Sequence, residues 1–134
     1  PKEKTVITKG IRELCAEAEA IVETWTVEQA REHLEDDDVV LVDIRDIRER
    51  QKTGFIPGSY HAPRGMIEFW VDPESPYFKP IFGENGKHYV FHCASGWRSA
   101  LSVATLQNMG FEASHLKHGF SDWVKQGGPT EQSE

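Results

Sequence analysis

The chain has 134 residues, of which 38% are hydrophobic and 28% charged, and its formal net charge is −7. This length suits one domain with a real hydrophobic core, and the acidic balance disfavours nucleic acid as a partner. No apolar run is long enough to cross a membrane, no signal-peptide pattern is visible, and the two cysteines suit a reducing compartment. We therefore expect a cytoplasmic protein with neither a nucleic-acid nor a membrane partner.

A helical N-terminal extension is predicted for residues 1–22, ahead of a main domain covering 23–134. Within the extension, apolar residues recur at helical spacing over Gly10–Val22. The main domain then begins with a short strand that ends at Thr26. The same threonine is expected to cap a helix that runs to about residue 34, with Gln29 completing a capping box.

The next segment alternates strand and helix. Val39–Val42 is a β-branched apolar run without alternation, as in a strand buried on both faces. Asp46 and Glu49 have the spacing of a capping box and open a helix that Gly54 ends. Ser59–His61 is predicted to be a short strand.

The second half of the chain holds a long insert, Arg64–Lys87, which is mostly loop by its Pro and Gly content. The elements predicted in this half are a helical turn or two in Met66–Val71, strand His88–His92, helix Ser99–Met109, strand Ala113–Leu116 and helix Phe120–Gln126. Helical spacing predicts that the second of these helices turns Leu101, Ala104, Thr105 and Met109 toward the core.

Strands that alternate with helices predict an α/β fold with a mainly parallel sheet covered on both faces. In such sheets, ligands bind beyond the carboxyl ends of the strands. Three segments reach that edge, namely Asp43–Arg45, His61–Pro63 and Cys93–Arg98, and His118 follows the last strand. A cleft is therefore expected around Cys93.

Cys93 itself follows a predicted strand, and Arg98 comes before a predicted helix, with four residues between them. The N–H groups of such a turn and of the helix start favour a thiolate, which predicts a nucleophile at neutral pH. The alternative is a cysteine that merely ends a core strand. A cysteine that merely ends a core strand would explain the apolar Val90 and Phe91. It would not explain the flexible Ser95–Gly96 pair or the positively charged Arg98.

From about residue 23 to residue 129, the sequence resembles the rhodanese family of sulfurtransferases. The residues that carry the resemblance are Asp43–Asp46 with Glu49 and Gly54–Ser59 for the first motif, Cys93–Arg98 for the six-residue active-site loop, and Met109–Phe111, His118–Trp123 and Gly127 toward the end. Several motifs in the right order make the resemblance specific.

The resemblance implies a rhodanese-like, five-stranded, mainly parallel sheet and a persulfide mechanism. Cys93 would take sulfane sulfur from a small-molecule or protein persulfide donor and pass it to a thiophilic acceptor such as cyanide or a thiol. Cys93 and Arg98 are the expected catalytic residues, with Arg98 orienting the loop or the donor's anionic group. The residues expected to cradle the persulfide are Ala94, Ser95, Gly96, Trp97 and Ser99. No cofactor is implied.

Two other functions remain open. A cysteine-dependent phosphatase or arsenate reductase also uses a cysteine, an N–H cradle and an arginine, but its usual loop is one residue longer, which would require Arg where Ser99 stands. A non-catalytic protein-binding module is disfavoured by the intact Cys93 and Arg98. Within the sulfurtransferase reading, the uncharged Ala94, Ser95 and Trp97 predict that thiosulfate is a poor donor.

No metal site is expected at His88, His92 and Cys93. Neighbours in a strand point to opposite faces, and His88 and His92 would lie roughly 13 Å apart on the same face. His61 and His118 could handle protons near Cys93, but a structural or solvent-exposed role is favoured for each.

The roles of some further residues also follow from their positions. Arg45 and Glu49 are spaced for a helix-edge ion pair, which favours a structural role for Arg45, while Asp43 is left open. Cys15 is either a passive helix residue or a thiol that resolves an oxidised Cys93. The aromatic residues of the insert and the loop form either a lid or simple packing; they are Phe69, Trp70, Tyr77 and Trp97.

Overall fold

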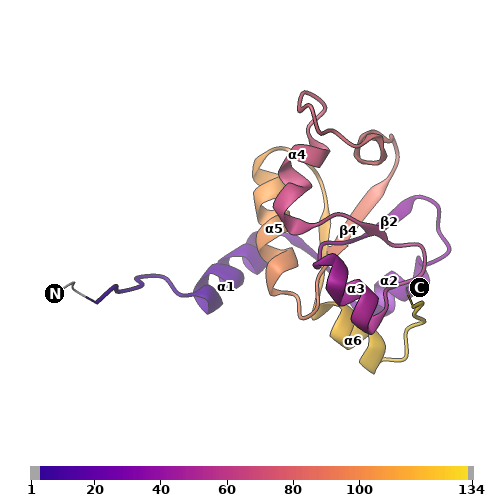
Figure 1. The fold of residues 1–134 in the computed structure, drawn as a ribbon, viewed down its shortest axis with the longest axis horizontal. Helices are drawn as coiled ribbons and strands as arrows, with labels where there is room; N and C mark the ends of the chain where they lie inside the picture. The colour runs from indigo at the N-terminus through magenta and orange to yellow at the C-terminus, as the bar shows by residue number, and fades with distance from the viewer. Residues whose placement is uncertain (1–3, 133–134) are drawn as a thin grey trace.

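The computed structural model describes residues 4–132, and its centre is a sheet of five strands that all run parallel (Figure 1). The strands are β1 (Glu23–Trp25), β2 (Val39–Asp43), β3 (Tyr60–His61), β4 (His88–His92) and β5 (Ser114–Leu116). Their order across the sheet is β1-β5-β4-β2-β3. The predicted α/β class and five-stranded parallel sheet are confirmed.

Six α-helices surround this sheet in the described part of the chain: α1 (Ile11–Ile21), α2 (Val27–Glu32), α3 (Ile47–Thr53), α4 (Ile67–Val71), α5 (Trp97–Asn108) and α6 (Gly119–Lys125). Two 3-10 turns, η1 (Arg64–Met66) and η2 (Pro80–Gly83), lie in the insert, and η2 falls where the sequence predicted loop. Asp46 and Glu49 form the predicted capping box. Thr26 caps α2 by accepting a hydrogen bond from the backbone of Gln29.

Two hydrophobic clusters cover the two faces of the sheet because successive strand residues point to opposite sides. In β4, Tyr89 and Phe91 belong to the cluster that α4 and α5 complete. Val90 belongs to the other cluster, together with Phe120 and Trp123 of α6 and residues of α2. The strand that carries Cys93 at its end is therefore buried on both sides, which fixes the position of the loop that follows.

Helix α5 presents a different face to the core from the one predicted. Its buried residues are Ser99, Ala100, Ser102, Val103 and Leu106. Leu101 and Ala104 are half-buried, whereas Thr105 and Met109 are exposed. The helix starts directly behind the Cys93 loop, so the contact of Ser99 with that loop sets its rotation. Ala104 of the predicted face still packs against the core cluster.

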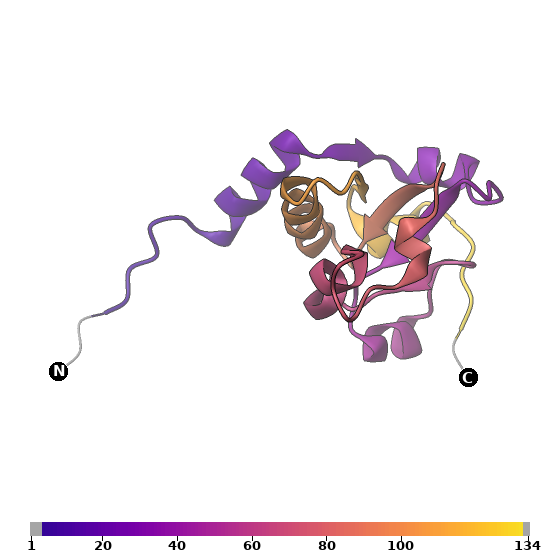
Figure 2. The same cartoon turned by 90° about the horizontal axis from the view of Figure 1, so that it is seen from above.

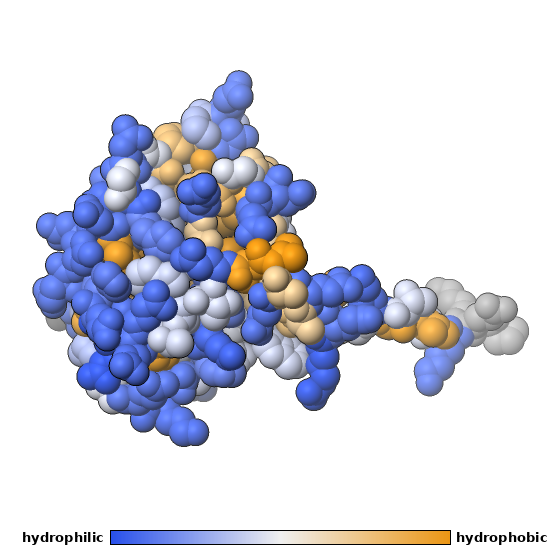
Figure 3. All heavy atoms as spheres, turned by 180° about the vertical axis from the view of Figure 1, so that it is seen from behind, coloured by the Kyte–Doolittle hydropathy of each residue, from blue (hydrophilic) through white to orange (hydrophobic). Residues whose placement is uncertain are grey.

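Helix α1 lies beside α5 at one end of the body, and residues 4–10 lead away from it (Figures 1 and 2). Cys15 and Ala18 are buried against the body, while Val6 and Ile7 are exposed. The molecular surface seen from behind is largely hydrophilic, with hydrophobic patches near the junction of the N-terminal segment and the body (Figure 3). Within residues 4–132, no helix has the length and apolar character needed to span a bilayer.

The insert aromatics and Trp97 do not form one group. Trp70 packs edge-on to Tyr60, with ring centres 6.3 Å apart, and Phe69 packs in the same manner on Tyr77. The Trp97 ring instead lies under the guanidinium of Arg12 in α1, 5.8 Å from its centre. These aromatic side chains therefore do not form a single lid over Cys93, because Trp97 lies against α1 and not against the insert.

Candidate active site

The Cys93 thiol lies at the carboxyl end of β4, fully buried. The backbone N–H of Gly96 donates to its sulfur at 3.1 Å, and the backbone N–H of Ser99 does so at 3.4 Å. The thiol in turn donates to Ser99 Oγ at 3.6 Å. Three contacts from one short loop therefore converge on the sulfur, and all three come from residues that the sequence placed in the cradle.

The first turn of α5 adds unpaired donors to this loop. The backbone N–H groups of Trp97 and Arg98 donate to no atom among residues 4–132, as is usual at a helix N-terminus. Such groups carry partial positive charge and favour an anion in front of them. Ala94 and Ser95 complete the loop, with Ser95 and Trp97 exposed at its surface.

The start of helix α6 forms hydrogen bonds with the backbone of the Cys93 loop. The carbonyl oxygens of Cys93 and Ala94 accept hydrogen bonds from Phe120 and Ser121 at the start of α6, at 2.8 and 2.9 Å. Gly119 permits this approach, because its φ is +60° and a Cβ there would collide with the Cys93 carbonyl. The carbonyl groups of the loop therefore point toward α6, and the N–H groups of the loop remain free to face the Cys93 sulfur.

Glu49 of α3 binds Arg98. The sequence spacing predicted Arg45 as the partner of this carboxylate instead. Two guanidinium nitrogens of Arg98 donate to the two Glu49 oxygens at 2.8 and 3.0 Å. The Glu49 carboxylate is the main reason why the pKa of Arg98 is raised, and the nearby Cys93 sulfur adds a smaller effect in the same direction. The ion pair with Glu49 fixes the loop to α3.

Arg45 belongs to a buried cluster around Asp43 at the end of β2. Arg45 and Arg50 donate to the Asp43 carboxylate at 2.8 to 3.2 Å. Burial acts to raise the pKa of Asp43, but His92 and Arg45 outweigh it and hold the pKa well below its ordinary value. The His92 ring nitrogen lies 3.7 Å from the carboxylate, beyond hydrogen-bond distance, so the two arginines make the direct contacts. This cluster is structural.

His61 and His118 have the structural and exposed positions that were favoured for them. His61 bonds the backbone oxygen of Arg45 at 2.6 Å, and His118 adopts φ +62° at the start of α6. The residue that reaches the site is His115 of β5, whose Nδ1 lies 2.8 Å from Ser99 Oγ. No sequence pattern points to His115, because only the pairing of β5 beside β4 places it under α5.

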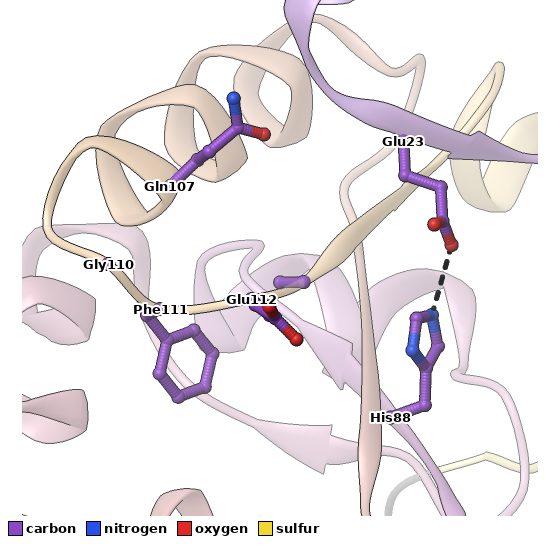
Figure 4. A pocket seen from close by; sticks show the side chains of 7 residues that line it. Glu23, His88, Gln107, Gly110, Phe111 and Glu112 are labelled. Carbon is purple, nitrogen blue, oxygen red and sulfur yellow. Dashed lines mark ion pairs between the residues drawn. The ribbon is translucent and has the colours of Figure 1, made fainter.

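Hollows border the loop on two sides. One is lined by Ser95, His118, Ser121, Asp122 and Lys125, and the other by Arg12, Cys15, Ala16, Glu19 and Trp97. A larger hollow of about 590 Å³ lies at the opposite edge of the sheet, where Glu23 faces His88 at 3.4 Å (Figure 4). It lies at the amino end of β4, so it has no access to Cys93.

Cys15 is buried in α1 and donates to the Trp97 carbonyl oxygen at 3.9 Å. Burial, followed by the carboxylate of Glu19, raises the pKa of the Cys15 thiol. Both cysteines are free. A raised pKa disfavours the thiolate, so this environment suits a passive cysteine better than a reactive one.

Comparisons with known proteins place this arrangement in a family. Curated relatives include the rhodanese domain-containing protein CG4456 of Drosophila melanogaster, 28% identical over 108 residues that cover 77% of this chain and 97% of that protein. The thiosulfate sulfurtransferase/rhodanese-like domain-containing protein 3 of Mus musculus is also 28% identical, over 74% of this chain and 66% of its own length.

Among solved structures, RPA3614 of Rhodopseudomonas palustris, a protein of unknown function described as a possible tyrosine phosphatase, is 47% identical. The match covers 97% of this chain and all of that one, with a TM-score of 0.91. A thiosulfate sulfurtransferase of Pseudomonas aeruginosa has the same fold, with a TM-score of 0.67 and 23% identity over 84% of this chain and 20% of that one. The model of the rhodanese-like domain matches residues 26–126, and the chain therefore belongs to the rhodanese-like domain family.

Proposed function

We propose that the protein is a sulfurtransferase that moves sulfane sulfur from a donor to a thiophilic acceptor through a persulfide on Cys93. The observation that carries the proposal is the pair of backbone donors on Cys93 Sγ, from Gly96 and Ser99, with further free N–H groups at the start of α5. A persulfide ends in an anionic sulfur, and this set of donors suits such an anion. Membership of the family supports the same chemistry.

The reaction proceeds in two displacements. The Cys93 thiolate attacks the outer sulfur of a persulfide donor, a new S–S bond forms, and the donor's own thiolate leaves with the electron pair of the broken bond. An acceptor thiolate then attacks the outer sulfur of the Cys93 persulfide, and Cys93 leaves as a thiolate. Electrons balance without an external oxidant or reductant.

The donor is proposed to be a small-molecule or protein persulfide in a reducing, cytoplasmic compartment, and the acceptor a thiol. The hollows beside Ser95 and Trp97 give two approaches to the loop. Thiosulfate suits the site less well, because the loop's one cation, Arg98, is paired with Glu49. A dianion gains little from a guanidinium whose charge is already compensated.

A second candidate is a cysteine-dependent phosphatase, which the description of the Rhodopseudomonas palustris relative favours. The loop argues against it. Gly96 and Ser99 already lie within 3.4 Å of the sulfur, so the cradle is fitted closely to one sulfur atom and leaves little room for a phosphoryl group.

The deciding experiment measures both activities on the same protein. Wild type is incubated with glutathione persulfide and its intact mass recorded before and after addition of cyanide. Hydrolysis of an aryl phosphate is followed in parallel. We expect one added sulfur atom on Cys93, lost to cyanide as thiocyanate, and no phosphate release.

The variants Cys93→Ser and Cys15→Ser provide the matched controls. Serine has no accessible anion at neutral pH, so Cys93→Ser is expected to lose sulfur transfer by at least about a thousandfold while remaining folded. Cys15→Ser should stay within about twofold of wild type, because Cys15 is an unreactive buried thiol. Phosphate release without sulfur uptake would replace this proposal with the phosphatase.

A further inference from the structure

His115 is a buried polar residue that the two displacements leave unused. Its side chain has no solvent exposure, and its Nδ1 lies 2.8 Å from Ser99 Oγ. Ser99 Oγ in turn lies 3.6 Å from Cys93 Sγ. A continuous set of contacts thus joins β5, the first turn of α5 and the candidate nucleophile.

The surroundings of the imidazole determine which nitrogen carries its proton. Nε2 is buried and has no hydrogen-bond partner among residues 4–132. A proton on Nε2 would be an unpaired buried N–H, whereas a proton on Nδ1 finds the Ser99 oxygen. The tautomer with the proton on Nδ1 is therefore favoured.

Burial also favours the neutral form of the ring. Burial lowers the pKa of His115 from its ordinary value. Among the charged groups that act on it, Glu19 of α1 opposes this effect, while His118 and Lys117, just beyond β5, add to it. His115 is thus a fixed hydrogen-bond donor and not a charged group.

This tautomer determines where the Ser99 hydroxyl points. If Nδ1–H donates to Ser99 Oγ, the single hydroxyl proton must go elsewhere, and two acceptors are in reach. They are the Gly96 carbonyl oxygen at 3.4 Å and Cys93 Sγ at 3.6 Å. Once the sulfur is negatively charged, the bond to it becomes charge-assisted and is the stronger of the two.

We propose that His115 is a positioning residue that directs the Ser99 hydroxyl toward Cys93 Sγ, and that this hydroxyl stabilises the Cys93 thiolate during sulfur transfer. The inference rests on the sulfurtransferase activity proposed above. Its clearest consequence lies in the second displacement. There the acceptor thiolate bonds to the outer sulfur, the S–S bond breaks, and its electron pair goes to Sγ, which leaves while accepting the Ser99 hydrogen bond. No proton moves to His115.

The test uses the full chain with the variants Ser99→Ala, His115→Leu and His115→Asn. Leucine removes the donor at similar volume, whereas the asparagine amide retains an N–H near the position of Nδ1. Each protein is loaded with sulfur from glutathione persulfide, mixed with cyanide, and followed in a single turnover. The pH profile of Cys93 alkylation by iodoacetamide is recorded on the unloaded proteins, in a Cys15→Ser background.

Ser99→Ala and His115→Leu are expected to slow the second displacement about tenfold, the effect of losing one hydrogen bond to a charged group. Both should move the alkylation profile to higher pH. His115→Asn should recover most of the wild-type rate. The double variant Ser99→Ala/His115→Leu should be no slower than Ser99→Ala alone, because both changes remove the same hydrogen bond.

Rates within about twofold of wild type for Ser99→Ala, or additive losses in the double variant, would overturn the proposal. If His115→Leu does not fold, Ser99→Ala and His115→Asn decide the matter on their own. Failure of the wild type to take up sulfur would reject the sulfurtransferase, whereas the alkylation profiles would still report whether Ser99 and His115 stabilise the thiolate.

Discussion

At the scale of single residues, the arginine of the active-site loop owes its position to a carboxylate from another element. Glu49 belongs to the capping box of α3 and also binds Arg98 through both oxygens. One side chain thus completes a helix cap, fixes the loop and compensates the loop's cation. The weak attraction that we expect for a dianionic donor rests on this pairing and not only on the uncharged loop residues.

Replacing Glu49 by glutamine tests this pairing. Glutamine retains an oxygen for the capping box but no longer compensates the charge of Arg98. We expect the KM for the thiosulfate dianion to fall about two- to fivefold, the range of one partly exposed ion pair, with a smaller change for a persulfide donor whose transferred sulfur carries a single charge. Steady-state kinetics with both donors measure the effect. An equal change with both donors would mean that the loop itself had moved.

At the scale of elements, α5 connects the site to the core. Its first turn supplies N–H groups and Ser99 to the sulfur, and its later turns pack Val103 and Leu106 into the cluster on one face of the sheet. The rotation of this helix about its axis is therefore set twice, by the loop and by the core. The donors are held in place by packing far from the sulfur.

Two truncations distinguish the observed face of α5 from the predicted one. Val103→Ala removes fully buried methyl groups, and we expect it to lower the free energy of unfolding by about 2 kcal/mol. Met109→Ala changes a side chain that is 46% exposed and should cost less than about 0.5 kcal/mol. Urea denaturation followed by tryptophan fluorescence compares them. A larger loss for Met109→Ala would restore the predicted face.

At the scale of the whole molecule, the Asp43 cluster joins parts of the chain that meet only in the folded state. Arg45 bonds the carbonyl oxygen of Gly54 at 2.8 Å, and Arg50 bonds the Ser59 hydroxyl at 3.1 Å, while both bind Asp43. The end of β2, helix α3 and the turn before β3 are thereby fixed together. The single carboxylate of Asp43 therefore compensates the charges of two buried arginines, Arg45 and Arg50.

The stability of the fold should consequently depend on the ionisation of Asp43. Its pKa is lower in the folded than in the unfolded state, so the ionised carboxylate stabilises the fold above the unfolded value of about 3.9. This contribution is lost as the pH falls below that value toward the folded pKa. Asp43→Asn should cost about 3–5 kcal/mol at pH 7, because two buried arginines lose their partner.

Urea titrations at neutral and acidic pH measure this loss, with the exposed Asp37→Asn as the matched control. The difference between wild type and Asp43→Asn should shrink below about pH 4. Asp37→Asn should follow the wild type at both values. A constant difference across the range would show that shape, not charge, determines the cost.

The sequence by itself determined the class of fold and the position of the candidate active-site loop. Strands without alternation, separated by capped helices, specify a buried parallel sheet, because each pattern follows from backbone geometry and burial over a few residues. The same local logic placed Cys93 at a strand end, with Gly96 and Ser99 following it. Asp46 and Glu49 were found as a cap because both partners lie within one helical turn.

Only the tertiary structure decided which side chains meet across the sheet. Glu49 binds Arg98, not Arg45, because α3 and α5 both start at the carboxyl edge of neighbouring strands. His115 reaches Ser99 because β5 pairs with β4. Such contacts join residues far apart in the chain, and local periodicity carries no information about them. The candidate nucleophile was therefore evident in the sequence, while the residues that contact it and hold its loop emerged only with the fold.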